Sequence, residues 1–173
     1  MYFKKLNYNF KINNYIIENY ITSYKLNSEK DFFKGLIYHT IDKSNDQLFD
    51  IIPSKYKNLF KIAHLKINCD ARPHIDNGIK TSINFYLKTN NCKTSFYSFI
   101  NPKLPKTIPL DISNLKEEDS FVAKKNEVWI LDVSKPHSVI SINNVFENRI
   151  AICLQTGLNF QIVLKMLNEY FET

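Results

Sequence analysis

The chain has 173 residues, of which 44% are hydrophobic and 14% aromatic, and its formal net charge is +6. These values predict one globular domain, residues 1–173, with its own hydrophobic core. They exclude an intrinsically disordered chain. The chain has only three glycines and no glycine-rich phosphate loop, which excludes the common nucleotide-binding α/β folds.

The three cysteines, Cys69, Cys92 and Cys153, are widely spaced and form no C-x-x-C pair. We therefore expect reduced, buried thiols rather than a disulfide framework or a zinc knuckle. The N-terminus lacks the apolar run of a signal peptide, and no stretch reaches the roughly 18 apolar residues of a membrane span. These features predict a soluble, cytoplasmic protein without a membrane partner. The scattered lysines favour a solvated surface, and they leave a nucleic-acid partner open without indicating one.

The first sixty residues predict a mixed, partly helical segment that supports a sheet. Apolar residues at helical spacing predict a helix within residues 15–26. Residues 31–41 fit either a helix or a strand. A short helix is predicted over residues 54–61, because Ser54 follows Pro53 and can open it.

Residues 61–157 have the texture of a β-sheet protein, with short apolar or alternating runs separated by Pro, Asn, Asp and Gly. The predicted strands are residues 62–68, 79–87, 94–100, 127–133, 137–142 and 149–155. The proline-rich residues 101–110 predict an irregular loop that shapes substrate access, and residues 116–120 predict a solvated loop. The fold class that follows is mostly β, a two-sheet sandwich or jelly roll with helical cover.

Residues 158–173 predict a C-terminal helix that covers this sheet. Its apolar stripe comprises Ile162, Val163, Met166, Leu167 and Tyr170. Trp129, the only tryptophan of the chain, is expected to pack in the core.

The predicted strand of residues 79–87 has one apolar and one polar face, because side chains alternate along a strand. Ser82, Asn84 and Tyr86 share the polar face, and His74 and Asp76 have the same parity if the strand extends back to them. A turn at Asn77-Gly78 would break that parity. A polar strand face turned into a barrel predicts a ligand cavity.

His74 and Asp76 could supply two ligands of a facial metal site, which needs a third ligand from elsewhere. His137 is the candidate, because it follows a predicted strand and a proline and begins another strand. Arg149 begins the last predicted strand, and an arginine in a cavity binds a carboxylate through two hydrogen bonds. Each of the four also has a simpler interpretation, as a turn residue or, for Arg149, as a surface partner of Glu127 or Glu147.

The order His-x-Asp, distal His, later Arg resembles the 2-oxoglutarate- and Fe(II)-dependent oxygenases, which are built on a double-stranded β-helix. The segments "PHIDNGIKTSINFYL" and "WILDVSKPHSVISI…NRIAI" resemble small prolyl-hydroxylase-like members of bacterial or viral type. The resemblance covers approximately residues 62–157.

The resemblance implies that His74, Asp76 and His137 hold Fe(II) and that Arg149 binds the far carboxylate of the cosubstrate 2-oxoglutarate. O2 would be the second cosubstrate, and Asn84 and Tyr86 would line the cosubstrate pocket. Asp76 distinguishes the chain from halogenating members, which replace this carboxylate by a small residue. The resemblance thus implies an oxidoreductase, a dioxygenase that hydroxylates a peptidyl or amino-acid-like substrate. The tyrosine that relatives often carry shortly before His-x-Asp is absent here.

Two other functions remain open from the residues alone. A cupin-like metalloprotein, an isomerase or a dioxygenase without 2-oxoglutarate, would need the metal ligands but not Arg149. A non-catalytic jelly-roll binding protein would need neither.

Overall fold

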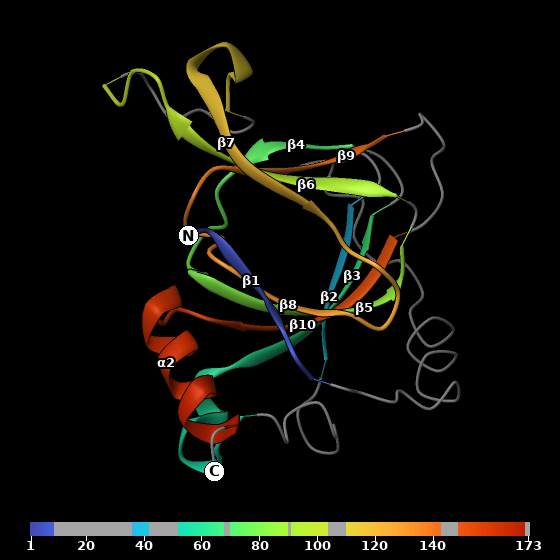
Figure 1. Ribbon diagram of the computed structural model, residues 1–173, viewed down its shortest axis with the longest axis vertical. Helices are drawn as coiled ribbons and strands as arrows, with labels where there is room; N and C mark the ends of the chain where they lie inside the picture. The colour runs from blue at the N-terminus through green and yellow to red at the C-terminus, as the bar shows by residue number, and fades with distance from the viewer. Residues whose placement is uncertain are drawn as a thin grey trace.

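The computed structural model describes residues 1–8, 36–41, 52–67, 70–89, 91–103, 110–142 and 149–171. These residues form two antiparallel sheets that face each other, with one α-helix outside (Figure 1). The elements are β1 (Phe3–Leu6), β2 (Leu36–Ile41), the 3-10 helix η2 (Ser54–Leu59), β3 (Lys61–Ile67), β4 (Ala71–His74), β5 (Thr81–Lys88), β6 (Cys92–Phe99), the 3-10 helix η3 (Ile112–Asn114), β7 (Leu115–Val122), β8 (Val128–Leu131), β9 (His137–Ser141), β10 (Arg149–Thr156) and α2 (Phe160–Phe171).

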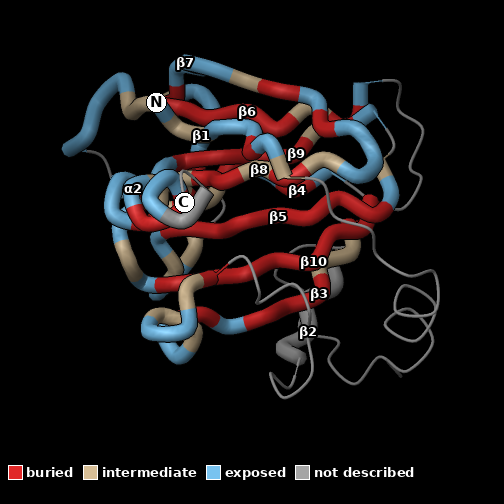
Figure 2. The backbone as a smooth tube through the Cα atoms, turned by 60° about the horizontal axis from the view of Figure 1, so that its bottom comes forward, coloured by how far each residue is buried: buried red, intermediate tan, exposed pale blue. Residues whose placement is uncertain are grey.

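The larger sheet has six strands in the order β1-β8-β5-β10-β3-β2, and the smaller has four in the order β4-β9-β6-β7. Both are built from strands distant in sequence. The tubes of β5 and β10, at the centre of the larger sheet, are buried almost throughout (Figure 2). All six predicted strands are present within two or three residues of their expected bounds.

The outer face of the larger sheet carries the main hydrophobic core. Ile83 and Phe85 of β5 and Ile152 and Leu154 of β10 are fully buried there. They share this face because side chains alternate along a strand. Fully burying a side chain of this size stabilises the fold by about 1.5–3 kcal/mol.

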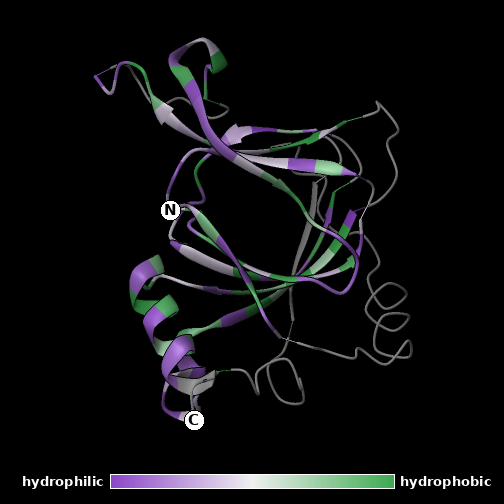
Figure 3. Ribbon diagram, in the orientation of Figure 1, coloured by the Kyte–Doolittle hydropathy of each residue, from purple (hydrophilic) through white to green (hydrophobic). Residues whose placement is uncertain are grey.

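Helix α2 covers this core, as the apolar stripe predicts. Its hydrophobic and hydrophilic residues lie on different sides of the helix (Figure 3), and Val163 and Leu167 are completely buried. The inclusion of Ile162 in the stripe is wrong, because Ile162 is 54% exposed and Phe160 makes the buried contact of the first turn. No described helix is long and apolar enough to cross a membrane.

The described part of the first sixty residues adds two strands to the larger sheet. β1 pairs with β8 at one edge, and β2 pairs with β3 at the other. Residues 36–41, which fit helix or strand equally by sequence, are therefore a strand. The short helix at Ser54 is confirmed as the 3-10 helix η2. The helix expected within residues 15–26 lies outside the described residues.

The interpretation of residues 116–120 as a solvated loop is wrong, because they lie in strand β7. Their side chains are mostly exposed and charged, so they show no apolar alternation. β7 is an edge strand that pairs only with β6. Charged side chains on an edge strand discourage pairing with another chain, which explains a strand whose composition resembles a loop.

The chain changes sheets between His74 and Thr81. β4 ends at His74 in the smaller sheet, and β5 begins at Thr81 in the larger one. The reversal passes through Gly78, whose φ of 75° is a conformation that favours glycine. Of the two alternatives that the sequence left open, the break near Asn77-Gly78 is therefore the one present, and His74 reaches the cavity from the opposite sheet.

Candidate metal centre

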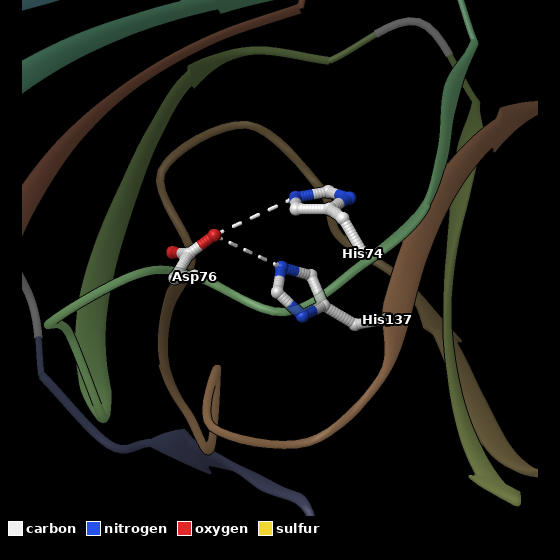
Figure 4. A group of neighbouring side chains, drawn as sticks. All are labelled: His74, Asp76 and His137. Atoms are coloured by element: carbon white, nitrogen blue, oxygen red, sulfur yellow. Dashed lines mark ion pairs between the residues drawn. The ribbon is translucent and has the colours of Figure 1, made fainter. Parts of the chain in front are cut away.

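His74, Asp76 and His137 converge between the two sheets (Figure 4). Strands β4 and β9 pair so that His74 lies directly opposite His137, with ring centroids 4.3 Å apart. Asp76 Oδ1 lies 3.5 Å from His74 Nε2 and 3.8 Å from His137 Nε2. One ligand atom from each residue thus lies within 4.8 Å of the other two.

Both imidazoles are oriented by backbone carbonyls behind them. His74 Nδ1 lies 2.7 Å from the Arg72 carbonyl, and His137 Nδ1 lies 2.9 Å from the Lys135 carbonyl. A carbonyl only accepts, so each Nδ1 carries the hydrogen and donates it. Each Nε2 therefore faces Asp76, which is the orientation that metal-binding histidines adopt.

The environment of His74 favours its neutral form. Burial is the largest influence, and together with the proximity of His137 it lowers the pKa of His74 to about 4. The Arg72 carbonyl and Asp76 act in the opposite direction but do not outweigh these effects. A neutral imidazole at pH 7 can bind a metal without first releasing a proton.

The three residues form part of the wall of a cavity of about 190 Å³ between the sheets. Its described lining is mostly aliphatic or uncharged, with contributions from both sheets: Leu65, Ile67, Ala71, His74, Asp76, Asn77, Ile79, Ser82, Asn84, Thr94, Leu131, Val133, His137, Val139, Arg149, Cys153 and Gln155.

Arg149 reaches the cavity from the first residue of β10 and is only 4% exposed. Its Nη1 donates to Thr94 Oγ1 at 3.0 Å and its Nη2 to the Tyr86 hydroxyl at 2.7 Å. The guanidinium carbon also lies 4.6 Å from the centre of the Tyr86 ring. These contacts hold the guanidinium in place without neutralising its charge.

No carboxylate among the described residues forms an ion pair with Arg149. Glu127, the described candidate for a surface pair, instead bonds Lys5 at 2.7 Å. A buried cation without a counter-charge is costly unless an anion joins it. The cavity that holds the His-Asp-His cluster therefore also contains a buried positive charge that an anion could neutralise.

No family model matches the chain, and no curated protein matches it. Among solved structures it is similar to a prolyl-4-hydroxylase from Pseudomonas putida, with 12% identity, a TM-score of 0.54, and 89% of this chain and 91% of that chain covered. It is also similar to EvdMO1, with 12% identity, a TM-score of 0.52, and 89% and 46% covered.

A vicilin from Solanum melongena matches with 10% identity, a TM-score of 0.46, and 80% of this chain covered. The chain spans 32% of that vicilin's length, and about as little of the other vicilins that it matches. At such identities, similarity concerns the fold alone. The two facing antiparallel sheets and their strand order identify the fold of this chain. It is the double-stranded β-helix.

The double-stranded β-helix brings together every residue that the sequence predicted for the site except one. His74, Asp76, His137, Asn84 and Arg149 all line the cavity. Tyr86 is fully buried behind Arg149 and is not among the described lining residues, so it contacts the site through that guanidinium. Asn84 connects to it, since its Nδ2 donates to the Tyr86 hydroxyl at 3.4 Å.

Three residues at the site belong to no motif that the sequence analysis identified. Thr94 and Gln155 line the cavity, and Phe96 packs on His137 with ring centroids 5.8 Å apart. Alternation along β10 places Gln155 on the same side as Arg149, a signal that could have identified it. Thr94 and Phe96 become visible only once β6 pairs with β9.

The donor set fits a metal ion. Two imidazoles and one carboxylate on one side of a cavity are the facial ligand set of non-haem iron sites, and they leave adjacent positions open. Within the described residues this is the one group of His, Cys, Asp and Glu close enough to share a metal. The oriented Nε2 atoms support the same conclusion.

Proposed function

We propose that the chain is a 2-oxoglutarate- and Fe(II)-dependent oxygenase. The observation that carries the proposal is a buried guanidinium without an acidic partner among the described residues, in the same cavity as a His-Asp-His cluster. The cluster by itself would suit many metalloproteins. A dicarboxylate that chelates the metal at one end and meets Arg149 at the other accounts for both features.

In this proposal His74, Asp76 and His137 hold Fe(II), and Arg149 binds the far carboxylate of 2-oxoglutarate through two hydrogen bonds. When bound, iron, 2-oxoglutarate and O2 together supply an oxidation of a substrate C–H bond, with succinate and CO2 as the co-products. Asp76 supports hydroxylation, because a carboxylate occupies the position that a halogenating enzyme would leave to a halide.

The chain's own residues orient the ligands and exclude water. The carbonyls of Arg72 and Lys135 hold the Nδ1 protons of the two histidines. Thr94 and Tyr86 fix the guanidinium of Arg149 in position. The aliphatic walls lower the local polarity, which strengthens the attraction between that guanidinium and a carboxylate.

The substrate is proposed to be peptidyl or amino-acid-like. The proposal follows the resemblance of the sequence to prolyl-hydroxylase-like enzymes and the shared fold with the Pseudomonas putida prolyl-4-hydroxylase. The proline-rich loop is proposed to shape access to the site. Leu110, the first described residue after its undescribed part, donates its backbone N–H to the Pro73 carbonyl at 2.8 Å, one residue from His74.

Calorimetric titration of 2-oxoglutarate into the metal-loaded protein tests the proposal. Arg149→Ala should weaken binding at least a hundredfold, because a charged, bidentate contact in a buried site is lost. Arg72→Ala is the matched control, since Arg72 is exposed and its backbone carbonyl remains. If the Arg149→Ala protein binds 2-oxoglutarate as tightly as the unchanged protein, the cupin-like metalloprotein replaces the oxygenase.

A further inference from the structure

A small apolar cluster beside the smaller sheet is separate from the main hydrophobic core. Its buried members are Tyr97, Leu110 and Leu115, and the half-buried Ile75 and Phe99 pack against them. We call it the Tyr97 cluster. None of its five members is among the described residues that line the cavity. The cluster nevertheless contacts the chain next to each residue of the candidate metal centre.

Tyr97 holds the residues on both sides of His137. Its backbone N–H donates to the Pro136 carbonyl at 2.9 Å. Its hydroxyl lies 2.8 Å from Ser138 Oγ, in a hydrogen bond in which either oxygen can donate. Tyr97 and Ser138 are 4% and 0% exposed, so this bond is shielded from water. Because residues 136 and 138 are both held, the backbone of His137 between them is held as well.

Leu110 and Ile75 attach the segment that carries the other two residues of the centre. The Leu110 backbone N–H donates to the carbonyl of Pro73, the residue before His74, at 2.8 Å. Ile75 lies between His74 and Asp76 and packs against the Tyr97 cluster. The segment is therefore attached to the cluster both by a backbone hydrogen bond and by a side chain.

We propose that Tyr97 and Leu110 are positioning residues, which set the distances among the three metal ligands without touching the metal. One cluster contacts both ligand-bearing segments, so a change in its packing would change their separation. Metal affinity depends on that separation, because ligand atoms bind tightly when they are already held in the productive geometry. Phe99 is not assigned this role, because it pairs with Leu115 of β7, a strand without ligands.

The inference rests on the metal-binding part of the proposed function and does not depend on the cosubstrate. Its test is Leu110→Ala, with Leu6→Ala as the matched control. Both leucines are 6% exposed, but Leu6 lies in the main hydrophobic core. Both substitutions remove the same atoms and should lower the urea midpoint. The dissociation constant for zinc, measured by competition with a chromophoric chelator, should rise about tenfold in Leu110→Ala and stay unchanged in Leu6→Ala.

The geometry of the metal site supplies a second readout, which a merely structural role would not change. The visible spectrum of bound Co(II) reports the arrangement of its ligands. It should shift in Leu110→Ala and stay the same in Leu6→Ala. If Leu110→Ala does not fold, Tyr97→Phe tests the proposal, because it removes only the oxygen that bonds Ser138 and should also shift the spectrum. Tyr56→Phe is its control, since the half-buried Tyr56 packs against the main core.

Two results would overturn the inference. One is an equal loss of zinc affinity in Leu110→Ala and Leu6→Ala. The other is an unchanged zinc affinity together with an unchanged cobalt spectrum in the folded Leu110→Ala or Tyr97→Phe protein.

The outcome is separable from that of the proposed function. If the unchanged protein binds neither zinc nor cobalt, the proposed metal centre fails, and the positioning role that rests on it fails as well. If the unchanged protein binds both metals but the variants bind them in the same way, the metal centre stands and only the positioning role is wrong.

Discussion

The position of the Arg149 guanidinium depends on two neutral acceptors, the side-chain oxygens of Thr94 and Tyr86. A substitution of Thr94 tests one of them. Thr94→Val keeps the shape of the side chain but removes the oxygen that accepts from Nη1 at 3.0 Å. Leaving a buried charged donor without its acceptor should cost about 1–3 kcal/mol of unfolding free energy. Urea unfolding measures this loss. Thr89→Val, at a half-buried position, is the control, and an equal loss in both variants would contradict the assigned role of Thr94.

Cys153 lines the cavity, yet its thiol should be inert. Burial raises the pKa of Cys153 to about 12, so the thiol stays protonated at all pH values well below 12. Because the thiolate is the nucleophile, iodoacetamide at pH 8 should modify Cys153 only after the protein is unfolded. Mass spectrometry of the native and denatured protein measures this. Rapid modification of Cys153 in the native state would contradict the structure.

At the scale of residues, the sequence predicted which candidate side chains meet in the cavity better than it predicted the contacts that hold them. His74, Asp76, His137 and Arg149 could be recognised because their order and residue types are unusual together. Their neighbour Thr94 could not, because a threonine in an alternating strand is common and its role depends on the position of Arg149. The indirect role of Tyr86 likewise follows only from the side-chain packing.

At the scale of elements, β1 and β6 together support the metal centre. Tyr2 and Phe3 pack on Phe96, with ring centroids 5.7 and 5.5 Å away, and Phe96 packs on His137. The aromatic stack therefore links the edge strand of the larger sheet to His137, a candidate metal ligand in the smaller one. Among the described aromatic residues, Phe96 and His74 contact the His137 ring and restrict its motion.

Phe96→Leu tests this support. The substitution should cost about 1–3 kcal/mol of unfolding free energy through lost packing. It should also weaken zinc binding about tenfold, the lower bound for losing a partner that orients a ligand. Equilibrium dialysis measures the affinity. Phe99→Leu is the control, because half-buried Phe99 packs near Tyr97 and Leu115 instead. Zinc binding that is unchanged in Phe96→Leu would refute the role of the stack.

The elements that could be predicted are those whose side chains face an apolar core on at least one side. β5 and β10 carry a buried face and show it in their alternation. β7 is an edge strand with charged side chains, and β4 is four residues long and contains Pro73. Such strands are defined by backbone pairing with partners distant in sequence. A local sequence pattern does not indicate that pairing.

At the scale of the molecule, the candidate metal centre joins two paired strands of the smaller sheet to the crossing that leads into the larger one. His74 ends β4, Asp76 lies in the crossing between the sheets, and His137 begins β9. A bound metal would therefore resist separation of all three segments. This arrangement predicts that metal binding stabilises the whole fold rather than one loop.

A divalent metal at about a hundred times its dissociation constant should add about 2.7 kcal/mol to the unfolding free energy. For a chain of this length the melting midpoint should rise by about 5–10 °C. Chelation with EDTA should reverse the rise, and Asp76→Ala should abolish it. Asp111→Ala, an exposed acid, should retain it. An equal rise in Asp76→Ala would place the metal elsewhere.

The overall architecture was predictable because many short alternating strands between turns leave few alternatives to two facing sheets. The change of sheet between His74 and Thr81 was not, because the register of each strand is decided by partners more than fifty residues away. The sequence left open whether one strand runs from His74 to Leu87, and the structure has two strands there, one in each sheet.

The central claim is that 2-oxoglutarate chelates an iron held by His74, Asp76 and His137. The visible spectrum of the protein, purified without oxygen and given Fe(II) and then 2-oxoglutarate, tests it most directly. Chelation of the keto acid should produce a weak charge-transfer band that is absent in Asp76→Ala. Iron binding without that band would contradict the claim and leave a metalloprotein that does not use 2-oxoglutarate.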